Sequence, residues 1–323
     1  MVVSIVFAVT SCTAMAALYV RRLIDERQQR HERADDIALS RELMAARTPE
    51  QVDTLRERFR SIDHERRTRV FSHLLQLVRG DDHDRLMRLA DALGMPDGAI
   101  RRLRKGNAAQ RVDAMRELER YPLPRAVEAL ERCLAQDRRH DVRLEAAAAL
   151  ARIGSVPAPG VLIDTLDLRR RPINRLHEAI LRAGAPRHSA ELIALSRDPA
   201  TGRVRPLLVE ALGWIGDFSV LAVLHDHAGD PDPAVRAAAA RAARKLGHPG
   251  AGSWLIPLLL DPFDQVRIQA VRAAGQLGLT QAIPMLAALV ENPSWWVRMR
   301  AVEALALLRG GQPSPEAPIG LRR

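Results

Sequence analysis

Aromatic residues are scarce in this chain of 323 residues: Phe, Trp and Tyr make up 3% of it, although hydrophobic residues make up 47%. A core built from this sequence must therefore consist mainly of Ala, Leu, Val and Ile. Small aliphatic side chains suit closely packed helices, whereas β-sheets draw on aromatic and β-branched residues. The scarcity of aromatics therefore argues against an all-β protein.

Cysteine and lysine are scarce as well. Cys12 and Cys133 lie far apart in the sequence, which excludes a disulfide framework and a metal site built from cysteines. Lys105 and Lys245 are the only lysines, so Arg supplies nearly all of the 49 basic residues behind the net charge of +10. The excess charge is spread along the chain, and by itself it indicates an anionic partner only weakly.

Residues 2–20 form a stretch without a charged side chain, and the stretch ends at Arg21 and Arg22. A helix that spans a bilayer needs about 20 apolar residues, and positive charges favour the cytoplasmic side. The stretch therefore predicts a single-pass transmembrane anchor with its N-terminus outside and the rest of the chain in the cytoplasm. A cleaved signal peptide is the alternative, because Ala14 and Ala16 resemble a cleavage site. The positive side chains, however, stand only after the stretch, as in an anchor, whereas a signal peptide normally has basic residues before its apolar segment.

A pair of Val and Arg recurs along the chain with a period of 31 residues. The pair stands at 142–143, 204–205, 235–236, 266–267 and 297–298, and Ile173-Asn174 fills the gap in the series. Twelve residues after the Val, most copies carry a Gly: these are Gly154, Gly216, Gly247 and Gly278, with Gly184 one position early and Gly310 one position late. The regular spacing predicts six copies of one structural unit.

Each copy has the pattern of two helices joined by a turn. Ala and Leu stand four, seven and eight residues after the Val, which gives the second helix one apolar face, and the Gly ends this helix. A shorter apolar helix precedes it, and Asp-Pro or Asn-Pro separates the two, as at Asp261-Pro262. The sequence therefore predicts an all-α fold, an α-solenoid in which helical hairpins stack into a superhelix.

The segment DPFDQVRIQAVRAAGQLG at 261–278 resembles the HEAT-repeat family, in the short bacterial form named after phycobilisome lyases. The resemblance covers residues 126–310, and a weaker copy stands at 110–122. With the N-terminal stretch, it predicts four regions: a transmembrane anchor at 1–20, a juxtamembrane helix with degenerate capping repeats at 21–109, a HEAT-like repeat array at 110–310 and a disordered tail at 311–323.

The Arg after each Val is the most regular polar residue of the repeats. A ladder of Arg along a solenoid could bind an anion, but the repeats also supply carboxylate acceptors at their turns, as in Asp230 and Asp261. A partly buried Arg needs such a bidentate acceptor. We therefore expect these Arg residues to pair with Asp in their own or the neighbouring repeat.

The family also contains enzymes, among them a deoxyhypusine hydroxylase whose di-iron site uses His-Glu pairs in the second helices of its repeats. Such pairs stand here at His31-Glu32, His64-Glu65 and His177-Glu178, and none of them recurs in register. The other enzymatic branch, phycobilin lyase, offers no local motif to match. We therefore expect a protein that is not an enzyme, with no catalytic residues, no metal site and no cofactor.

In HEAT arrays the second helices line the concave face. The positions three, six and ten residues after the Val follow the solvent stripe of that helix. In the later repeats these positions carry cations beside a large aromatic side chain: Trp214, Arg241, Lys245, Arg272 and Arg300. We name these residues the basic strip and predict that it binds an acidic protein segment, because Trp and Arg are enriched at interface hot spots. A solvated face without a partner is the alternative.

A second basic cluster lies in turns one repeat apart and consists of Arg138, Arg139, Arg169, Arg170 and Arg171. Such a cluster suits anionic lipid headgroups or a protein partner. Trp295 and Trp296 fall in the turn of the last repeat, where they either cap the array or offer a docking point.

Together these features predict a non-enzymatic, membrane-tethered scaffold or adaptor that recruits a protein partner to the inner face of a bacterial cytoplasmic membrane. The alternatives are a HEAT-like enzyme related to the lyases and hydroxylases, of oxidoreductase type, and a solenoid that binds nucleic acid. A nucleic-acid partner is not expected, because Glu145, Glu210 and Glu303 interrupt a continuous track for phosphates. A small-molecule substrate is not expected either. If the signal-peptide alternative holds, the chain is exported instead.

Overall fold

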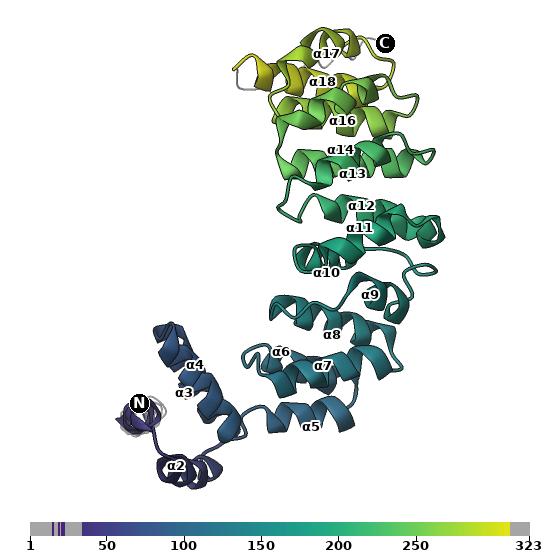
Figure 1. Ribbon diagram of the computed structural model, residues 1–323. Coiled ribbons are helices and arrows are strands. Elements are labelled where there is room, and N and C mark those ends of the chain that lie inside the picture. Colours follow the sequence, from purple (N-terminus) through teal and green to yellow (C-terminus); the bar gives the residue numbers. More distant parts are fainter. Residues whose placement is uncertain (1–14, 16–18, 20, 23–33, 311–323) are drawn as a thin grey trace, which may run out of the picture. The chain divides into compact units, whose positions relative to one another are not determined.

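In the computed structural model, the described part of the chain comprises residues 15, 19, 21–22 and 34–310, and Figure 1 draws the other residues in grey. All regular secondary structure in the described part is helical, as the sequence predicts. The chain forms two compact units. One contains the residues up to Lys105 together with Arg120–Ala126, and the other contains Gly106–Glu119 together with the residues from Val127 onward.

The first unit contains a helix at residues 34–45, followed by α2 (Pro49–Ser61), α3 (His64–Leu77), α4 (Asp81–Ala92) and α5 (Asp97–Lys105). Thr48 begins α2 with a capping box: its side chain accepts from the backbone N–H of Gln51, and the Gln51 side chain accepts from the backbone N–H of Thr48. In the core of this unit, Phe71 packs edge-on against Tyr121, with 6.3 Å between their ring centroids.

The second unit consists of helix pairs, each formed by a first and a second helix of a repeat. The first helices are most of α7 (Pro124–Gln136), α9 (Pro159–Thr165), α11 (Ser189–Arg197), α13 (Val220–Ala228), α15 (Gly252–Leu255) and α17 (Ile283–Leu289). The second helices are α6 (Ala108–Leu118), α8 (His140–Arg152), α10 (Arg175–Gly184), α12 (Arg205–Leu212), α14 (Pro233–Leu246), α16 (Asp264–Gln276) and α18 (Trp295–Leu308). Short 3₁₀ segments accompany them: η1 (Pro199–Val204), η2 (Pro249–Ala251), η3 (Pro257–Leu260) and η4 (Thr280–Ala282).

The second helices stack on one another in sequence order. Each of them from α6 to α18 packs against the next, and the first helices form a second layer alongside (Figure 1). This arrangement confirms the predicted α-solenoid of two-helix repeats within the described residues.

Small residues allow the second helices to approach closely. A Cβ added to Gly275 of α16 would lie 2.8 Å from the Cβ of Ala304 in α18, and one added to Gly213 would lie 2.5 Å from the carbonyl oxygen of Ala242 in α14. Neither contact is possible for a larger residue without a shift of the helices. The Ala-rich composition of the repeats therefore sets the distance between their layers.

Four of the five Gly residues after the second helices end them as predicted: Gly154, Gly247, Gly278 and Gly310. The helix α12 ends earlier, at Leu212 with Gly213 as its C-cap, so Gly216 closes the turn that follows this helix. Gly154, Gly216, Gly247, Gly278 and Gly310 have φ angles of 76°, 80°, 78°, 70° and 72°, in the left-handed region that favours glycine. Gly184 does not take this role. It remains helical, and a Cβ there would lie 2.9 Å from Cγ1 of Val156, so its lack of a side chain serves packing instead of a turn.

The first helices are more broken than the sequence predicts. The expected single helix from Gly252 divides into α15 and η3, because Pro257 lacks the N–H that would continue the α-helical ladder. The first helix of the last repeat likewise begins with the 3₁₀ turn η4 before α17. The second helices remain continuous, and they carry the predicted strip except Trp214, which follows the end of α12.

The predicted anchor at 2–20 lies outside the described residues, apart from Met15 and Tyr19, and so does the predicted tail at 311–323. In the part of the chain that is described, none of the helices combines the length and the apolar character needed to cross a bilayer.

Candidate functional site

The Arg ladder joins neighbouring repeats through the turns. Nε and Nη2 of Arg236 donate to the two carboxylate oxygens of Asp261 at 2.7 and 3.0 Å. The Asp261 carboxylate also accepts from the backbone N–H of Phe263 at 3.0 Å, and its carbonyl oxygen accepts from Arg267 at 2.6 Å. Burial opposes ionisation, but the bonds from Arg236 and Phe263 lower the pKa of Asp261. The predicted pairing with Asp is therefore confirmed here, and the role of this Arg is structural.

The same connection recurs at two other places along the array. It is absent where Leu168 or Asn292 replaces the Asp and where Asn174 replaces the Arg. Arg205 pairs with Asp230, as predicted, and Arg111 of the weaker copy pairs with Asp137 at 2.9 Å. In the repeat at 158–184 the turn offers Leu168 in place of Asp. Arg143 therefore donates to the carbonyl oxygen of Thr165 instead, at 2.8 Å.

Trp214 of the basic strip lies just after α12 and is held between two cations. Nζ of Lys245, from α14, is 3.8 Å from the centroid of the indole ring, and Cζ of Arg182, from α10, is 5.3 Å from it. Both distances are within the range of cation–π attraction. The indole remains 37% exposed, so it presents an apolar surface between two positive charges.

Arg182 also belongs to the site, but it was not predicted, because the predicted strip included only the positions three, six and ten residues after the Val of each repeat. It stands nine residues after Ile173, the position that Arg244 occupies after Val235. A search for cations at this ninth position would have found both. Arg182 also forms an ion pair with Glu178 at 3.6 Å within α10, which holds the guanidinium near the indole.

Two of the predicted cations are neutralised within the fold. Arg241 donates to Glu210 of the preceding repeat at 2.7 Å, and Arg300 donates to Glu303 on its own helix at 2.6 Å. Both ion pairs are partly exposed, and such pairs contribute little to stability. A carboxylate from a partner must compete with these Glu residues for the two Arg side chains.

At the centre of the strip, the positive charges have fewer carboxylate partners. Arg272 is exposed and has no hydrogen bond or ion pair among the described residues. Nη1 of the nearby Arg244 donates to the side-chain amide of Gln276 at 3.2 Å. Burial lowers the pKa of Arg244, and the charges of Arg272 and Arg241 lower it further, against the opposing effect of Glu210. Arg244 and Arg272 therefore carry positive charges without a carboxylate partner among the described residues.

The predicted solvent stripe is wrong at several positions. Leu207 and Ala238, three residues after their Val, are buried, and so is Ala148, six residues after Val142. The second helices from α8 to α16 pack against a second helix on both sides, and α12, α14 and α16 also pack against their own first helix, so they bury a wider arc than a helix at the surface of a layer. The strip is therefore narrower than predicted.

The second basic cluster lies in the turns before α8 and α10, and all five of its Arg residues are exposed. Arg139 forms a bidentate ion pair with Asp141, at 2.8 Å for the shorter bond, and Arg169 pairs with Asp164 at 2.6 Å. Arg138 has no side-chain partner among the described residues. The cluster is thus only partly compensated.

The His-Glu pairs do not converge. His31-Glu32 lies outside the described residues, and His64-Glu65 stands at the start of α3 in the first unit. His177 is buried, and its Nδ1 accepts from the backbone N–H of Asn174 at 3.0 Å, while Glu178 faces Arg182. Among the described residues, no group of three or more His, Cys, Asp and Glu side chains could hold a metal ion.

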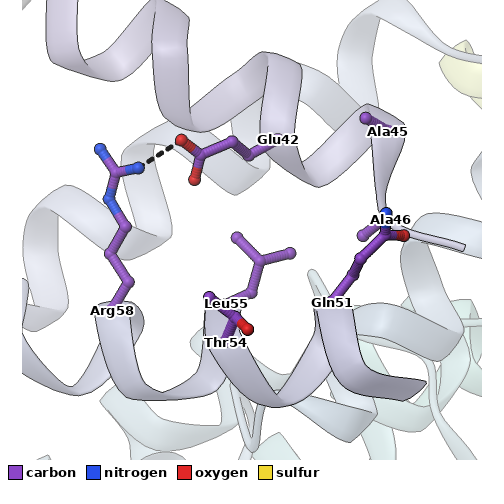
Figure 2. A pocket seen from close by; sticks show the side chains of 7 residues that line it. All are labelled: Glu42, Ala45, Ala46, Gln51, Thr54, Leu55 and Arg58. Carbon is purple, nitrogen blue, oxygen red and sulfur yellow. Dashed lines mark hydrogen bonds and ion pairs between the residues drawn. The ribbon is translucent and has the colours of Figure 1, made fainter. Parts of the chain in front are cut away.

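A pocket of about 350 Å³ lies in the first unit, between the helix at 34–45 and α2. Figure 2 shows Glu42 and Arg58 joined by an ion pair at one end of it, Gln51 at the other end, and Leu55 between them. The remaining wall is formed by Ala and Thr side chains. Its two charged side chains, Glu42 and Arg58, bind each other, so the pocket offers no convergent polar groups for a ligand.

Comparison with known families identifies HEAT repeats in the C-terminal part of the chain. Residues 189–265 and 252–323 match the family model for HEAT repeats. This match confirms the predicted repeat type over these residues. No curated protein matches the sequence.

Solved structures show the same fold class. Kap121p bound to Nup53p is similar with a TM-score of 0.52 at 12% identity, over 82% of this chain and 34% of that one. The CpcE–CpcF complex of phycocyanin lyase from Nostoc sp. PCC7120 matches with a TM-score of 0.34 at 23% identity, over 66% and 94% of the two chains. Human deoxyhypusine hydroxylase matches with a TM-score of 0.33 at 17% identity, over 88% and 99%. The likeness to Kap121p supports an armadillo- or HEAT-like solenoid.

Proposed function

We propose that this protein is a non-enzymatic scaffold that binds a protein partner through the basic strip, extended by Arg182 and Arg244. The observation that carries the proposal is the exposed indole of Trp214 between Lys245 and Arg182. An aromatic ring framed by cations buries apolar surface while it attracts negative charge.

The partner's segment is acidic and carries at least one apolar side chain. Carboxylates would pair with Arg272 and Lys245, and the apolar side chain would cover Trp214. The Glu partners of Arg241 and Arg300 make these two Arg residues selective, because a weakly acidic segment gains little by displacing Glu210 or Glu303. Kap121p, a solenoid of similar fold, is bound to the protein Nup53p in its crystal structure, which supports a protein as the class of partner.

A membrane tether is the second part of the proposal. The uncharged stretch at 2–20, followed by Arg21 and Arg22, supports a single-pass anchor in a bacterial cytoplasmic membrane, with the repeats on the cytoplasmic side. Export after signal cleavage is the alternative. A reporter fused to the C-terminus distinguishes them, because it is active in the cytoplasm only if the anchor prediction holds.

The strip is tested by charge reversal in the full chain. Arg241→Glu combined with Arg272→Glu removes two cations from partly exposed positions, so the fold is retained while the attraction for an acidic segment is reversed. Crosslinked complexes isolated from membranes should contain the partner with the wild-type chain and lack it with this variant. Trp214→Ala should weaken the same complex by at least tenfold, as for a hot-spot residue worth about 2 kcal/mol.

The control carries the same change of charge elsewhere. Arg138→Glu combined with Arg170→Glu alters two exposed turn residues that lie outside the strip. Loss of the partner with this control, and not with the strip variant, would move the binding site to the turns. Retention on duplex DNA that falls steeply with salt would replace the protein partner by a nucleic acid.

A further inference from the structure

The turns between the first and second helices of the repeats lie on one edge of the second unit, because every second helix begins there. We name this edge the turn ridge; it comprises residues 137–139, 166–175, 198–204, 229–232, 261–263 and 290–296. Its first three turns carry exposed arginines: Arg138, Arg139, Arg169, Arg170, Arg171, Arg175 and Arg203. The basic half of the ridge is thus larger than the second basic cluster described above.

The arginines of these three turns lie next to one another in space. Nη1 of Arg203 approaches the carbonyl oxygen of Arg170 at 3.5 Å, which joins the third turn to the second. Arg143 donates to the carbonyl oxygen of Asp137 in the first turn at 2.9 Å and to that of Thr165, next to the second turn, at 2.8 Å, which places the second turn close to the first. The positive charges therefore form one continuous surface.

The charge of this surface is only partly compensated. Arg139 and Arg169 have Asp partners at 2.8 and 2.6 Å, and Arg171 has one at 4.0 Å. No carboxylate lies within ion-pair distance of the others among the described residues: these are Arg138, Arg170, Arg175 and Arg203. Each of these guanidinium groups offers donors that fit a phosphate oxygen.

The last two turns of the ridge are aromatic. Phe263 is 49% exposed, and Trp295 and Trp296 are 49% and 58% exposed. The two indoles contact each other edge-on, with 4.6 Å between their centroids. Leu260, directly before the turn of Phe263, is 71% exposed. So much exposed apolar surface is unexpected in a chain with 3% aromatic residues.

We propose that the turn ridge docks on the surface of an anionic lipid bilayer. The arginines contact lipid phosphates, and the two Trp side chains enter the headgroup region, where Trp is enriched in membrane proteins. A bilayer fits better than an acidic protein because the cations lie on the first three turns of the ridge and the aromatics on the last two, with the turn at 229–232 between them, and they are not gathered around one pocket. The proposal relies on the proposed function in one respect, since the tether at 2–20 would hold the ridge near the membrane.

The test uses the full chain reconstituted with vesicles whose acyl chains carry bromine, which quenches Trp fluorescence on contact. We expect quenching in phosphatidylcholine mixed with phosphatidylglycerol, little quenching in phosphatidylcholine alone, and loss of quenching at high salt. Trp295→Phe combined with Trp296→Phe should remove most of the quenched signal. Arg170→Gln combined with Arg203→Gln should lower the ratio of docked to undocked protein about thirtyfold, at about fivefold per charge.

The control is Arg187→Gln combined with Arg309→Gln, which removes two exposed arginines near the opposite ends of the second helices and should leave quenching unchanged. Equal quenching in both lipids, or quenching that survives either ridge variant, would overturn the proposal. Absence of quenching together with loss of a crosslinked acidic protein in the Arg170 and Arg203 variant would make the ridge a protein site. The tether is judged separately, by salt-resistant flotation with phosphatidylcholine vesicles.

Discussion

At the scale of single residues, a turn Asp such as Asp261 connects three parts of the array. Asp261 binds the Arg of the preceding repeat, caps the turn that follows it, and offers its carbonyl oxygen to the Arg of its own repeat. Asn292 holds the same position in the last repeat and keeps the cap, through the backbone N–H of Ser294 at 3.0 Å. It lacks the charge, and Nε of Arg267, buried one repeat earlier, has no partner in the described part of the chain.

This difference gives a pair of opposite predictions. Asp261→Asn should keep the cap but leave Arg236 with a neutral acceptor, so we expect a loss of about 2 kcal/mol in the free energy of unfolding. Nη2 of Arg267 already pairs with the exposed Asp264 of its own helix, so Asn292→Asp should offer a second carboxylate to the unpaired Nε and gain about 1 kcal/mol. Urea unfolding of the full chain measures both. Stabilisation by Asp261→Asn, or an unchanged free energy of unfolding in both variants, would show that the carboxylate does not join the repeats.

At the scale of secondary-structure elements, the contact between α16 and α18 depends on one missing side chain. Gly275 lies within α16, where Ala would ordinarily stabilise the helix by about 1 kcal/mol. Its added Cβ would, however, lie 2.8 Å from the Cβ and 2.9 Å from the Cα of Ala304. Because backbone cannot move aside as a side chain can, the packing cost should exceed the gain in helix propensity.

We therefore expect Gly275→Ala to destabilise the second unit by about 1–3 kcal/mol, the range found for overpacked cores. Gly98→Ala in α5 is the matched control, because the nearest atom to its added Cβ is Nη1 of Arg102 at 3.8 Å. This control should be neutral or stabilising. Thermal unfolding followed by circular dichroism compares them, and an equal gain for both would show that α16 and α18 are not in such close contact.

At the scale of the whole molecule, the buried His177 and His227 and the half-buried His140 should make stability depend on pH. Burial lowers the pKa of His140, His177 and His227, and His227 also lies 3.0 Å from Ser196 through Nε2 and Oγ. The unfolded chain takes up protons at these histidines near pH 6.5, whereas the folded chain does so only at lower pH. Because the unfolded state then binds more protons, stability is full above about pH 7 and falls as the pH decreases through 6.5.

We expect the free energy of unfolding to fall between about pH 7.5 and about pH 5.5, by up to about 1.4 kcal/mol per pH unit for each histidine. Urea unfolding at the two pH values measures the fall. His227→Gln should reduce the dependence of the free energy of unfolding on pH by the contribution of one histidine, even if the variant is less stable at both pH values. A stability that is constant over this range would contradict the prediction. Asp261 does not interfere, because the pKa of this carboxyl is lowered and it titrates in more acidic solution.

The sequence was sufficient to predict the elements that depend on local chemistry. The period of 31 residues, the Gly after the second helix and the Asp at the turn each act within one repeat or between adjacent ones, so their spacing carries the information. The exception at Gly184 has a physical reason: whether a Gly ends a helix or makes room for Val156 depends on what packs against it. Periodicity cannot separate these two uses of the same residue.

The sequence by itself determined that the described part of the chain is helical, that its repeats are two-helix units, and that Arg and Asp join several of them, because these features follow from composition and short spacing. The tertiary structure alone decided which cations remain available. The stacking of the second helices brings Arg182 and Lys245 to Trp214, sets Glu210 against Arg241, and buries Leu207 and Ala238. These contacts depend on the rotation of each helix against the next, and a pattern along one chain does not contain that angle.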